Sequence, residues 1–266
     1  MTVALLGVPW DASSSYRRGA AGAPQAIRRE LERAREYSNP YTESGLDSSA
    51  PGVIRDAGDV TADDPAVARE SIERAVAEIA AAGERPFVLG GDHSITYPIL
   101  RAAARVHGPV DVLHFDAHPD LYPIFEGDPY SHACPFARAL EDGLIGRLVQ
   151  LGIRSMTPPQ QQVAERYGVE LTTMRDWGRP VGFFFERPVY VSLDVDVLDP
   201  GFAPAVSHPE PGGLSVREVI AVLQRIHGRV VGADLVEYNP TVDPDGRTAA
   251  VCVKLVKELT ALLAAG

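Results

Sequence analysis

The sequence predicts an α/β protein whose core is a parallel sheet covered by helices on both faces. About eight short apolar stretches run along the 266 residues, and segments with helical spacing alternate with them. Stretches that are apolar at nearly every position are typical of parallel strands buried on both sides. No linker, repeat or low-complexity segment divides the chain, so we expect a single domain over residues 1–266. A closed eightfold barrel is the alternative topology.

In the N-terminal half, each expected strand is a short apolar run bounded by Pro, Gly or polar residues. Pro24 stands in the first turn of the first expected helix, which suits its fixed φ, and Gly83 follows the second helix as a C-cap. Residues 38–51 are polar with Ser, Pro and Gly, which indicates a surface loop. In order, the expected elements are strand Val3–Val8, helix Pro24–Tyr37, strand Val53–Val60 (weak, broken by Gly58), helix Asp63–Ala82, strand Pro86–Leu89, helix Tyr97–Val106 and strand Asp111–Phe115.

The C-terminal half continues the alternation after a loop at residues 123–132. Ser215 with Glu218 three residues later is the capping-box pattern of a helix start. The expected elements are helix Pro135–Leu144, strand Leu148–Ile153, helix Gln160–Tyr167, strand Val169–Met174, strand Val189–Asp196, helix Ser215–Ile226, strand Val230–Val236 and helix Thr248–Ala264. Polar residues at the carboxyl ends of such strands converge on one edge of the sheet, where α/β proteins build their sites.

Composition narrows the function classes. The chain carries 25 Lys and Arg against 36 Asp and Glu, a net charge of −11, which argues against a nucleic-acid surface and is compatible with a cationic substrate. Cys134 and Cys252 form no CxxC, so neither a disulfide framework nor a cysteine zinc site is indicated. The sequence contains no apolar run of about 18 residues, so no membrane-spanning helix is predicted. Met1–Gly7 lacks a basic segment followed by a long apolar one, so we expect a cytoplasmic protein.

Three segments carry potential metal ligands just past an apolar strand. Asp116, His118 and Asp120 lie two residues apart, and Asp194 and Asp196 repeat that spacing. Because an extended chain repeats every two residues, we expect each set to share one face. His93 follows the Gly90-Gly91 turn and completes the pool. Buried charges of this density are costly unless a cation pairs with them.

The ligand types favour two hard divalent ions. The pool holds two imidazoles and four carboxylates. Four carboxylates are too many for one structural zinc, whose sites favour Cys and His in a closed tetrahedron. Manganese accepts both oxygen and imidazole, so we expect two Mn²⁺ ions bridged by carboxylates. Such a pair lowers the pKa of a bridging water and supplies hydroxide at neutral pH.

Other histidines and the glycine turn have plainer interpretations. His114 lies within its strand and is expected to be a hydrogen-bonded core residue, and His107 and His227 lie at helix ends, where solvent surrounds them. For any single Asp of the pool, a solvated loop acid is the simpler reading, but three coincident segments argue against it. Gly90-Gly91 belongs to neither of the common glycine-rich phosphate-binding motifs.

At these residues the sequence resembles the ureohydrolases, the arginase and agmatinase family. The resemblance extends over nearly the whole chain, from Gly22–Arg28 to Gly232–Pro240. Its three signatures occur in the family's order and are highly specific. They stand here as Gly90-Gly91-Asp92-His93-Ser94, Asp116-Ala117-His118-Pro119-Asp120 and Ser192-Leu193-Asp194-Val195-Asp196-Val197-Leu198-Asp199-Pro200.

The resemblance implies a three-layer α/β/α fold with an eight-stranded parallel sheet, a two-manganese centre and release of urea. The six ligands proposed above fall on the family's metal positions, and Asp120 is further expected to hydrogen-bond the bridging hydroxide. By the same match, His132 is the expected proton shuttle and Glu237 the carboxylate that grips the guanidinium. Family members are commonly trimers or hexamers, so the resemblance also implies a homo-oligomer.

The substrate is less constrained than the chemistry. Residues 125–138 look most like agmatinases and plant-type arginases, and Cys134 replaces the small Gly, Ser or Thr often found there. Glu126 and Asp128 would repel a carboxylate, which favours agmatine, cleaved to putrescine and urea. Ser207 and His208 are expected to line the pocket as well. Arginine is the alternative, cleaved to ornithine and urea, and guanidinobutyrate and similar compounds stay open.

Two further hypotheses assign the chain to other functional classes. Zinc deacetylases of acetylated amines share this fold, but they use one metal held by Asp, His and Asp, whereas His93 and the paired acids here suit two. A non-catalytic metal-binding pseudoenzyme is expected to have lost His132 or Glu237, and both are present.

Overall fold

The computed structural model describes residues 1–37, 40–61, 64–178 and 182–266, and its centre is one open sheet of eight parallel strands. The strand order is β2-β1-β3-β10-β8-β4-β5-β6, so the expected parallel sheet is confirmed and the closed barrel is excluded. The strands are β1 (Val3–Gly7), β2 (Ile54–Asp59), β3 (Arg85–Leu89), β4 (Val110–Phe115), β5 (Ile145–Ile153), β6 (Glu170–Thr173), β8 (Val189–Asp194) and β10 (Val230–Val236).

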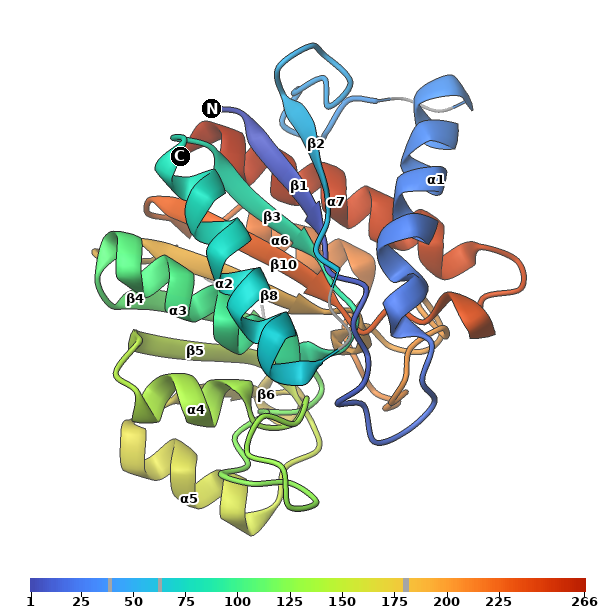
Figure 1. Cartoon of the computed structure of the whole chain (residues 1–266). Helices are drawn as coiled ribbons and strands as arrows, with labels where there is room; N and C mark the ends of the chain where they lie inside the picture. The colour runs from blue at the N-terminus through green and yellow to red at the C-terminus, as the bar shows by residue number, and fades with distance from the viewer. Residues whose placement is uncertain (38–39, 62–63, 179–181) are drawn as a thin grey trace.

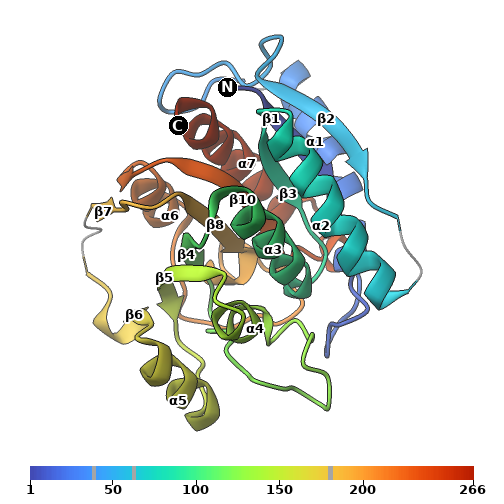
Figure 2. The same ribbon diagram turned by 60° about the vertical axis from the view of Figure 1, so that its left-hand side comes forward.

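Helices cover both faces of the sheet, which makes three layers (Figures 1 and 2). One group packs with one buried cluster, and a second group packs with the other. The first group is α1 (Ala23–Tyr37), α6 (Val216–Leu223) and α7 (Arg247–Ala265), and the second is α2 (Pro65–Ala81), α3 (Thr96–His107), α4 (Pro135–Glu141) and α5 (Pro158–Tyr167). The expected three-layer α/β/α arrangement is therefore confirmed.

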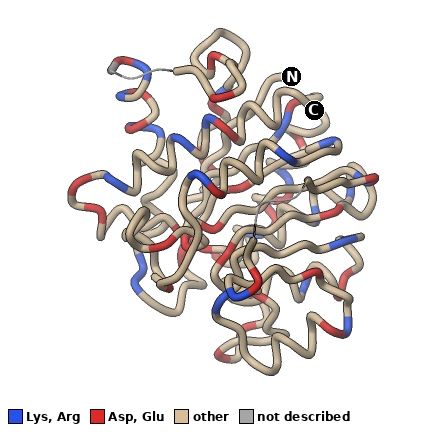
Figure 3. The backbone as a smooth tube through the Cα atoms, turned by 180° about the vertical axis from the view of Figure 1, so that it is seen from behind, with Lys and Arg blue, Asp and Glu red and all other residues tan. Residues whose placement is uncertain are grey.

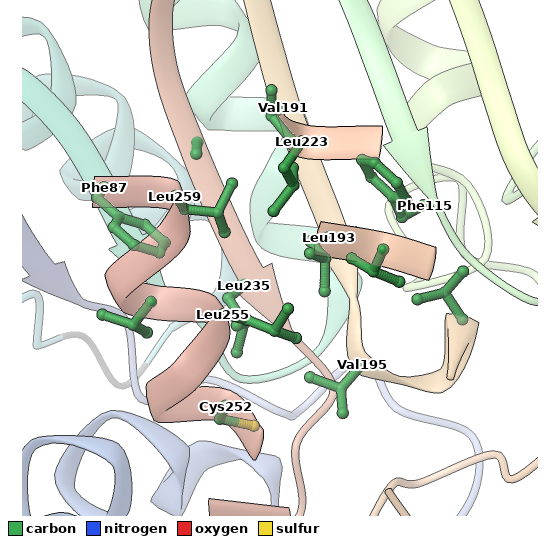
Figure 4. Packing of buried hydrophobic residues seen from close by; sticks show 14 of the residues in the cluster. Phe87, Phe115, Val191, Leu193, Val195, Leu223, Leu235, Cys252, Leu255 and Leu259 are labelled. Carbon is green, nitrogen blue, oxygen red and sulfur yellow. The ribbon is translucent and has the colours of Figure 1, made fainter. Parts of the chain in front are cut away.

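Alternation along the strands divides the apolar side chains between the two faces. In β3, Phe87 and Leu89 join the α7 side, whereas Val88 between them joins the α3 side. Figure 4 shows Leu255 of α7 directed at Leu235 of β10, and both side chains are fully buried. Burying a leucine side chain of this kind contributes about 1.5–3 kcal/mol. The packed faces fix where the carboxyl ends of the strands lie.

Element ends differ from the predictions in ways that matter for the site. β4 stops at Phe115 and β8 at Asp194, after which Val195–Val197 forms a 3-10 turn. α5 starts at Pro158, two residues before the predicted start at Gln160. A small parallel sheet of β7 (Phe183–Phe184) and β9 (Ile226–His227) was not predicted. The capping box of Ser215 is confirmed.

Surface charges are distributed over the whole fold. Figure 3 shows basic and acidic residues interspersed along the chain. Several form ion pairs between elements, such as Arg55 with Glu84 and Arg147 with Glu170. Within the described ranges, no helix is both long and apolar enough to cross a membrane. Residues 38–39 of the predicted loop and residue 63 of the predicted second helix lie outside the described residues.

Candidate metal centre

Three of four adjacent strands in the middle of the sheet deliver the predicted ligands to one edge. The order β3-β10-β8-β4 places their carboxyl ends side by side. His93 follows β3, Asp194 ends β8, and Asp116 comes directly after β4. Gly91 makes the approach of His93 possible, since a Cβ there would lie 1.7 Å from the carbonyl oxygen of Trp10. All six predicted ligands meet at this edge.

The first half of the cluster surrounds one nitrogen of His93. Its Nδ1 lies 3.1 Å from Asp116 Oδ2, 3.0 Å from Asp120 Oδ2 and 3.2 Å from Asp194 Oδ2. None of these oxygens makes a hydrogen bond with Nδ1, although the imidazole is completely buried. Three carboxylate oxygens around one ring nitrogen form a cradle for a small cation.

The second half is built on His118 and shares one carboxylate with the first. His118 Nδ1 lies 3.1 Å from Asp196 Oδ2 and 3.4 Å from Asp116 Oδ1. Asp116 thus turns one oxygen toward His93 and the other toward His118. The ligand atoms of Asp116, His118 and Asp196 lie within 4.8 Å of one another. A carboxylate shared between two ligand sets is what a two-ion centre needs.

A hydrogen-bond chain behind His93 sets the tautomer of its ring. The Ser192 hydroxyl donates to Asp234 Oδ1 at 2.7 Å, so its oxygen accepts the Nε2–H of His93 at 3.0 Å. Tyr190 and Thr96 donate to the other oxygen of Asp234. In its neutral form the imidazole directs the lone pair of Nδ1 at the three carboxylates. That arrangement is repulsive unless a cation lies between them, so the residues fit a metal ion. Burial lowers the pKa of His93, but the carboxylates of Asp116, Asp120 and Asp194 raise it well above its ordinary value, so without metal a proton occupies the place that suits a cation.

Electrostatics of the buried acids lead to the same conclusion. Burial, with the charge of Asp116 adding to it, raises the pKa of Asp120 to about 6. Burial and repulsion from Asp196 and Asp116 raise the pKa of Asp194 well above its ordinary value. Burial alone would lower the pKa of His118, but Asp196 and Asp116 raise it to about 12. The cluster holds more negative charge than its imidazoles neutralise, and bound cations would remove that cost.

His114 lies close enough to be mistaken for a ligand. One ligand atom each from His93, His114 and Asp116 also fall within 4.8 Å of one another. The Gln150 amide, however, donates to His114 Nδ1 at 2.9 Å and to the Pro119 carbonyl at 2.7 Å. Nε2 of His114 therefore carries the proton and donates it to Asp116 Oδ2 at 2.9 Å. This buried histidine orients a ligand, in agreement with the core role expected from its position.

The ligands meet because the chain bends, so the predicted reason for their convergence is wrong. Asp116 and Asp194 each accept the backbone N–H two residues ahead, at 2.6 and 2.7 Å, in turns that close after the strands. Asp196 lies in a 3-10 turn, not in an extended strand. Asp120 and Glu237 have φ of 50° and 66°, which is rare for residues with a side chain. Such backbone strain is concentrated at functional sites.

A cavity of about 170 Å³ opens directly onto the cluster. Its inner part is formed by ligands and by Glu237, and its outer part by uncharged polar and aromatic side chains. The lining residues are Ser15, His118, Asp120, Tyr122, Phe125, His132, Ala133, Ser155, Thr157, Gln160, Asp194, Asp196, His208 and Glu237. The structure therefore brings His132, His208 and Glu237 into one cavity with the expected metal ligands.

Glu237 and His132 are each held by one side-chain atom and present another to the cavity. Glu237 Oε1 accepts the backbone N–H of His93 at 2.9 Å, whereas the buried Oε2 has no hydrogen-bond partner among the residues that the structure describes. His132 donates its Nδ1–H to the Ser13 carbonyl at 2.8 Å, which leaves Nε2 as an acceptor. That Nε2 lies 3.4 Å from Ser15 Oγ. Burial lowers the pKa of His132.

Two of the predicted substrate residues lie outside the cavity lining. The Asp128 carboxylate accepts the backbone N–H of Tyr130 at 2.8 Å in an exposed turn, and Glu126 does not line the cavity either. Ser207 is buried and donates to the carbonyl of Arg17, so it holds the loop before α1. The proposed repulsion of a carboxylate by the acidic loop has no support in this geometry. Cys134 is buried, and burial raises the pKa of its thiol to about 12.

The outer cavity is shaped by His208, as predicted, and by Arg154, Thr157 and Gln160, which were not predicted. Arg154 donates to the carbonyls of Asp196 at 2.5 Å and Glu210 at 2.6 Å, and its other hydrogen bonds also go to main-chain carbonyls. It thereby ties the loop that carries His208 to the metal-ligand turn. His208 stacks on His132 with ring centroids 5.0 Å apart and 13° between the planes. Thr157 and Gln160 follow the capping-box pattern, which was readable in the sequence.

Comparisons with known proteins agree with the architecture and the residues of the centre. A model of the arginase family matches residues 1–261. The mitochondrial arginase of Medicago truncatula is 46% identical over 283 aligned positions, which cover 98% of this chain and 81% of that protein. The mitochondrial agmatinase of Gallus gallus is 36% identical, covering 99% of this chain and 81% of that protein.

The fold agrees as closely as the sequence does. The solved structure of the arginase from Medicago truncatula has a TM-score of 0.94 to this chain at 45% identity, and covers 98% of this chain and 87% of that one. A whole-chain family match, the shared fold and the buried His and Asp cluster lead to one conclusion: the chain belongs to the arginase family and is a hydrolase of the carbon–nitrogen bonds of linear amidines.

Proposed function

We propose that the protein is an arginase that cleaves L-arginine to L-ornithine and urea with two Mn²⁺ ions. The observation that carries the guanidino substrate is the buried, unpartnered Oε2 of Glu237 beside the ligand cluster. A carboxylate with one free oxygen at the inner end of a cavity forms a strong, charge-assisted hydrogen bond to a guanidinium. The matches named arginase, at 46% identity, support arginine more than the agmatinase match at 36% does.

The outer cavity supports arginine for a second reason. Among the lining residues, the only acids are Asp120, Asp194, Asp196 and Glu237, and all four belong to the inner end. An α-carboxylate at the outer end therefore meets uncharged groups. The sequence-based expectation of agmatine as substrate depends on Glu126 and Asp128, and neither residue lines the cavity.

The residues that would hold the two ions are His93, Asp116, Asp120, Asp194, His118 and Asp196, as two sets that share Asp116. Bound ions supply Lewis-acid activation of water at neutral pH, and Mn²⁺ suits a mixed imidazole and carboxylate set. The buried Ser192 and Asp234 keep His93 in the tautomer that this role needs.

His132 is suited to handle the proton of the departing amine. Its ring is fixed through Nδ1 by the Ser13 carbonyl, so only Nε2 exchanges a proton inside the cavity. Asp92 holds that carbonyl in place, because its buried carboxylate accepts the N–H of Ser13 at 2.9 Å. A general acid must be oriented before its pKa matters, and this pair of contacts orients the imidazole.

Agmatine is the second candidate, because the agmatinase relative aligns over 99% of this chain. The test is urea release by Mn²⁺-loaded protein, with L-arginine and agmatine measured side by side and a chelated control for each. We expect chelator-sensitive turnover with a larger kcat/KM for arginine. A larger value for agmatine would overturn the substrate proposal but keep the metal chemistry. Loss of urea from both substrates would overturn the proposed function.

A further inference from the structure

The capping box at the start of α5 fixes which end of the Gln160 amide meets the cavity. Gln160 Oε1 accepts the backbone N–H of Thr157 at 2.9 Å and its hydroxyl at 3.0 Å. Both Thr157 groups are donors in these contacts, so the oxygen of the carboxamide must be on that side. The Nε2 end of the carboxamide therefore has to point the other way.

The amide nitrogen of Gln160 is directed into the cavity without a partner. The side chain lines the cavity although the residue is only 3% exposed. Within the described residues, no hydrogen bond to Gln160 Nε2 is formed. Its two N–H donors reach the cavity and are therefore available to a ligand or to water that accepts from them.

The position of Gln160 is at the far end of the cavity from Glu237. Glu237 follows β10, and Gln160 lies in α5, the helix after β5. The sheet order β10-β8-β4-β5 separates the carboxyl ends of these two strands by three strand spacings of about 4.8 Å each. A span of about 14 Å is bridged by a linear guanidino compound together with the two side chains. A substrate held by Glu237 at its guanidinium thus extends its other end toward Gln160.

We propose that Gln160 is a specificity-determining residue that donates its amide N–H groups to the α-carboxylate of a guanidino amino acid. The inference rests on the proposed function and adds a recognition group for the end of the substrate that does not react. A carboxylate accepts from two N–H donors. The ammonium or methylene end of a diamine substrate offers no acceptor, so the locked amide gains nothing from agmatine.

The matched test is Gln160→Glu, an isosteric change that keeps the helix cap. Glutamate is a standard residue at this capping-box position, so one carboxylate oxygen still accepts from Thr157. The other oxygen replaces Nε2 and faces the cavity as a negative acceptor. Gln161→Glu is the control, because it adds the same charge one position along, where the side chain is exposed and contacts Glu165.

We expect Gln160→Glu to lower the ratio of kcat/KM for L-arginine to that for agmatine by about ten- to a hundredfold, mainly through KM for arginine. Gln161→Glu should leave the ratio within about twofold. An unchanged ratio in Gln160→Glu, or an equal change in both variants, would overturn the role of Gln160.

A binding measurement separates this inference from the proposed function. L-ornithine carries the carboxylate and putrescine lacks it, so calorimetric affinities for the two report on Gln160 without any turnover. Gln160→Glu should weaken ornithine at least tenfold and leave putrescine unchanged or tighter. If the wild-type protein releases no urea but this difference is found, the proposed function fails and the carboxylate site stands. If ornithine binds equally to both proteins, the carboxylate site fails.

Discussion

The two ends of the cavity are built on opposite principles. The inner end gathers five buried acids, which are Glu237 and the four ligand carboxylates, and the two ligand imidazoles; the acids repel one another without a cation. The outer end consists of uncharged side chains held by a helix cap and by main-chain carbonyls. The inner end therefore decides what bond is broken, whereas the outer end decides which molecule is bound. Changes at the inner end should cost metal and rate, and changes at the outer end should cost selectivity.

The largest effect is expected from His93→Ala. The variant removes the nitrogen that faces Asp116, Asp120 and Asp194 and leaves their charges unpaired. Bound Mn²⁺ should fall by about one ion per chain, and kcat should drop more than about a thousandfold, since even outer contacts of ligands cost 10–100-fold. Metal analysis and urea release measure both. His227→Ala, an exposed histidine stacked on Phe184, is the control. Full metal content with full rate in His93→Ala would contradict the metal assignment.

Glu237→Gln tests the inner end without removing a ligand. The glutamine oxygen still accepts from the backbone of His93, but the free oxygen loses its charge. We expect kcat/KM for arginine and for agmatine to fall alike, by about a hundredfold, while bound metal is unchanged. Glu210→Gln is a matched control, because Glu210 contributes only its carbonyl to Arg154. A loss confined to one of the two substrates would show that Glu237 recognises something other than the shared guanidinium.

Ser192→Ala removes the contact that sets the tautomer of His93. Without the serine oxygen, His93 Nε2–H loses its acceptor and Asp234 loses a donor. Mn²⁺ affinity should weaken about tenfold to a hundredfold, with kcat restored at saturating metal. Titration of the apo-protein with Mn²⁺ gives the affinity, and Ser49→Ala on an exposed turn serves as the control. Unchanged affinity would show that the hydrogen-bond chain behind His93 has no part in holding metal.

The smallest effect concerns the metal-free protein and its pH dependence. The pKa of Asp120 is about 6 in the folded state and ordinarily 3.8, so the folded chain holds a proton that the unfolded chain has lost. Stability from that proton is present at low pH and lost as pH rises through 6. Asp120→Asn should therefore raise the Tm of the apo-protein at pH 8 by a few degrees, and by less at pH 5.

Thermal melts of the wild-type and Asp120→Asn apo-proteins at both pH values test this expectation. Comparing the two proteins at the same pH removes the contribution of groups that titrate independently of Asp120. A gain in Tm that is larger at pH 5 than at pH 8 would contradict the charge repulsion inferred at the inner end.

The same division explains what the sequence could and could not predict. Asp116, His118 and Asp120 were found because ligand types recur after apolar strands, whatever the backbone between them does. The bends after the strands were not predicted, since they depend on hydrogen bonds that the carboxylates of Asp116 and Asp194 accept from the backbone N–H groups two residues ahead. The parallel sheet followed from strands that are apolar on both faces. The chemistry was thus predictable from residue type, but the geometry was not.

The outer end was less predictable for a physical reason. The charge of Asp128 says nothing about its direction, and the side chain turned out to face the N–H of Tyr130. The sequence pattern predicts Gln160 as the first residue of a helix, whereas in the structure Thr157 and Gln160 together form the helix cap. A search for Ser or Thr followed three residues later by Gln or Glu after every strand would have found it. His208 was predicted from its motif, and it lines the cavity.

Arg154 has a consequence for how this cavity changes over evolution. It holds the loop that carries His208 through the carbonyl oxygen of Glu210, a group that every amino acid possesses. Substitutions along that loop therefore leave the clasp intact, so new side chains can be sampled without loosening the scaffold. A library that varies residues 208–210 and keeps Ser207 and Arg154 fixed should be rich in folded, metal-loaded members that differ in substrate. Because Arg154 holds the loop by its backbone, the substrate preference can change while the metal centre and its reaction are kept.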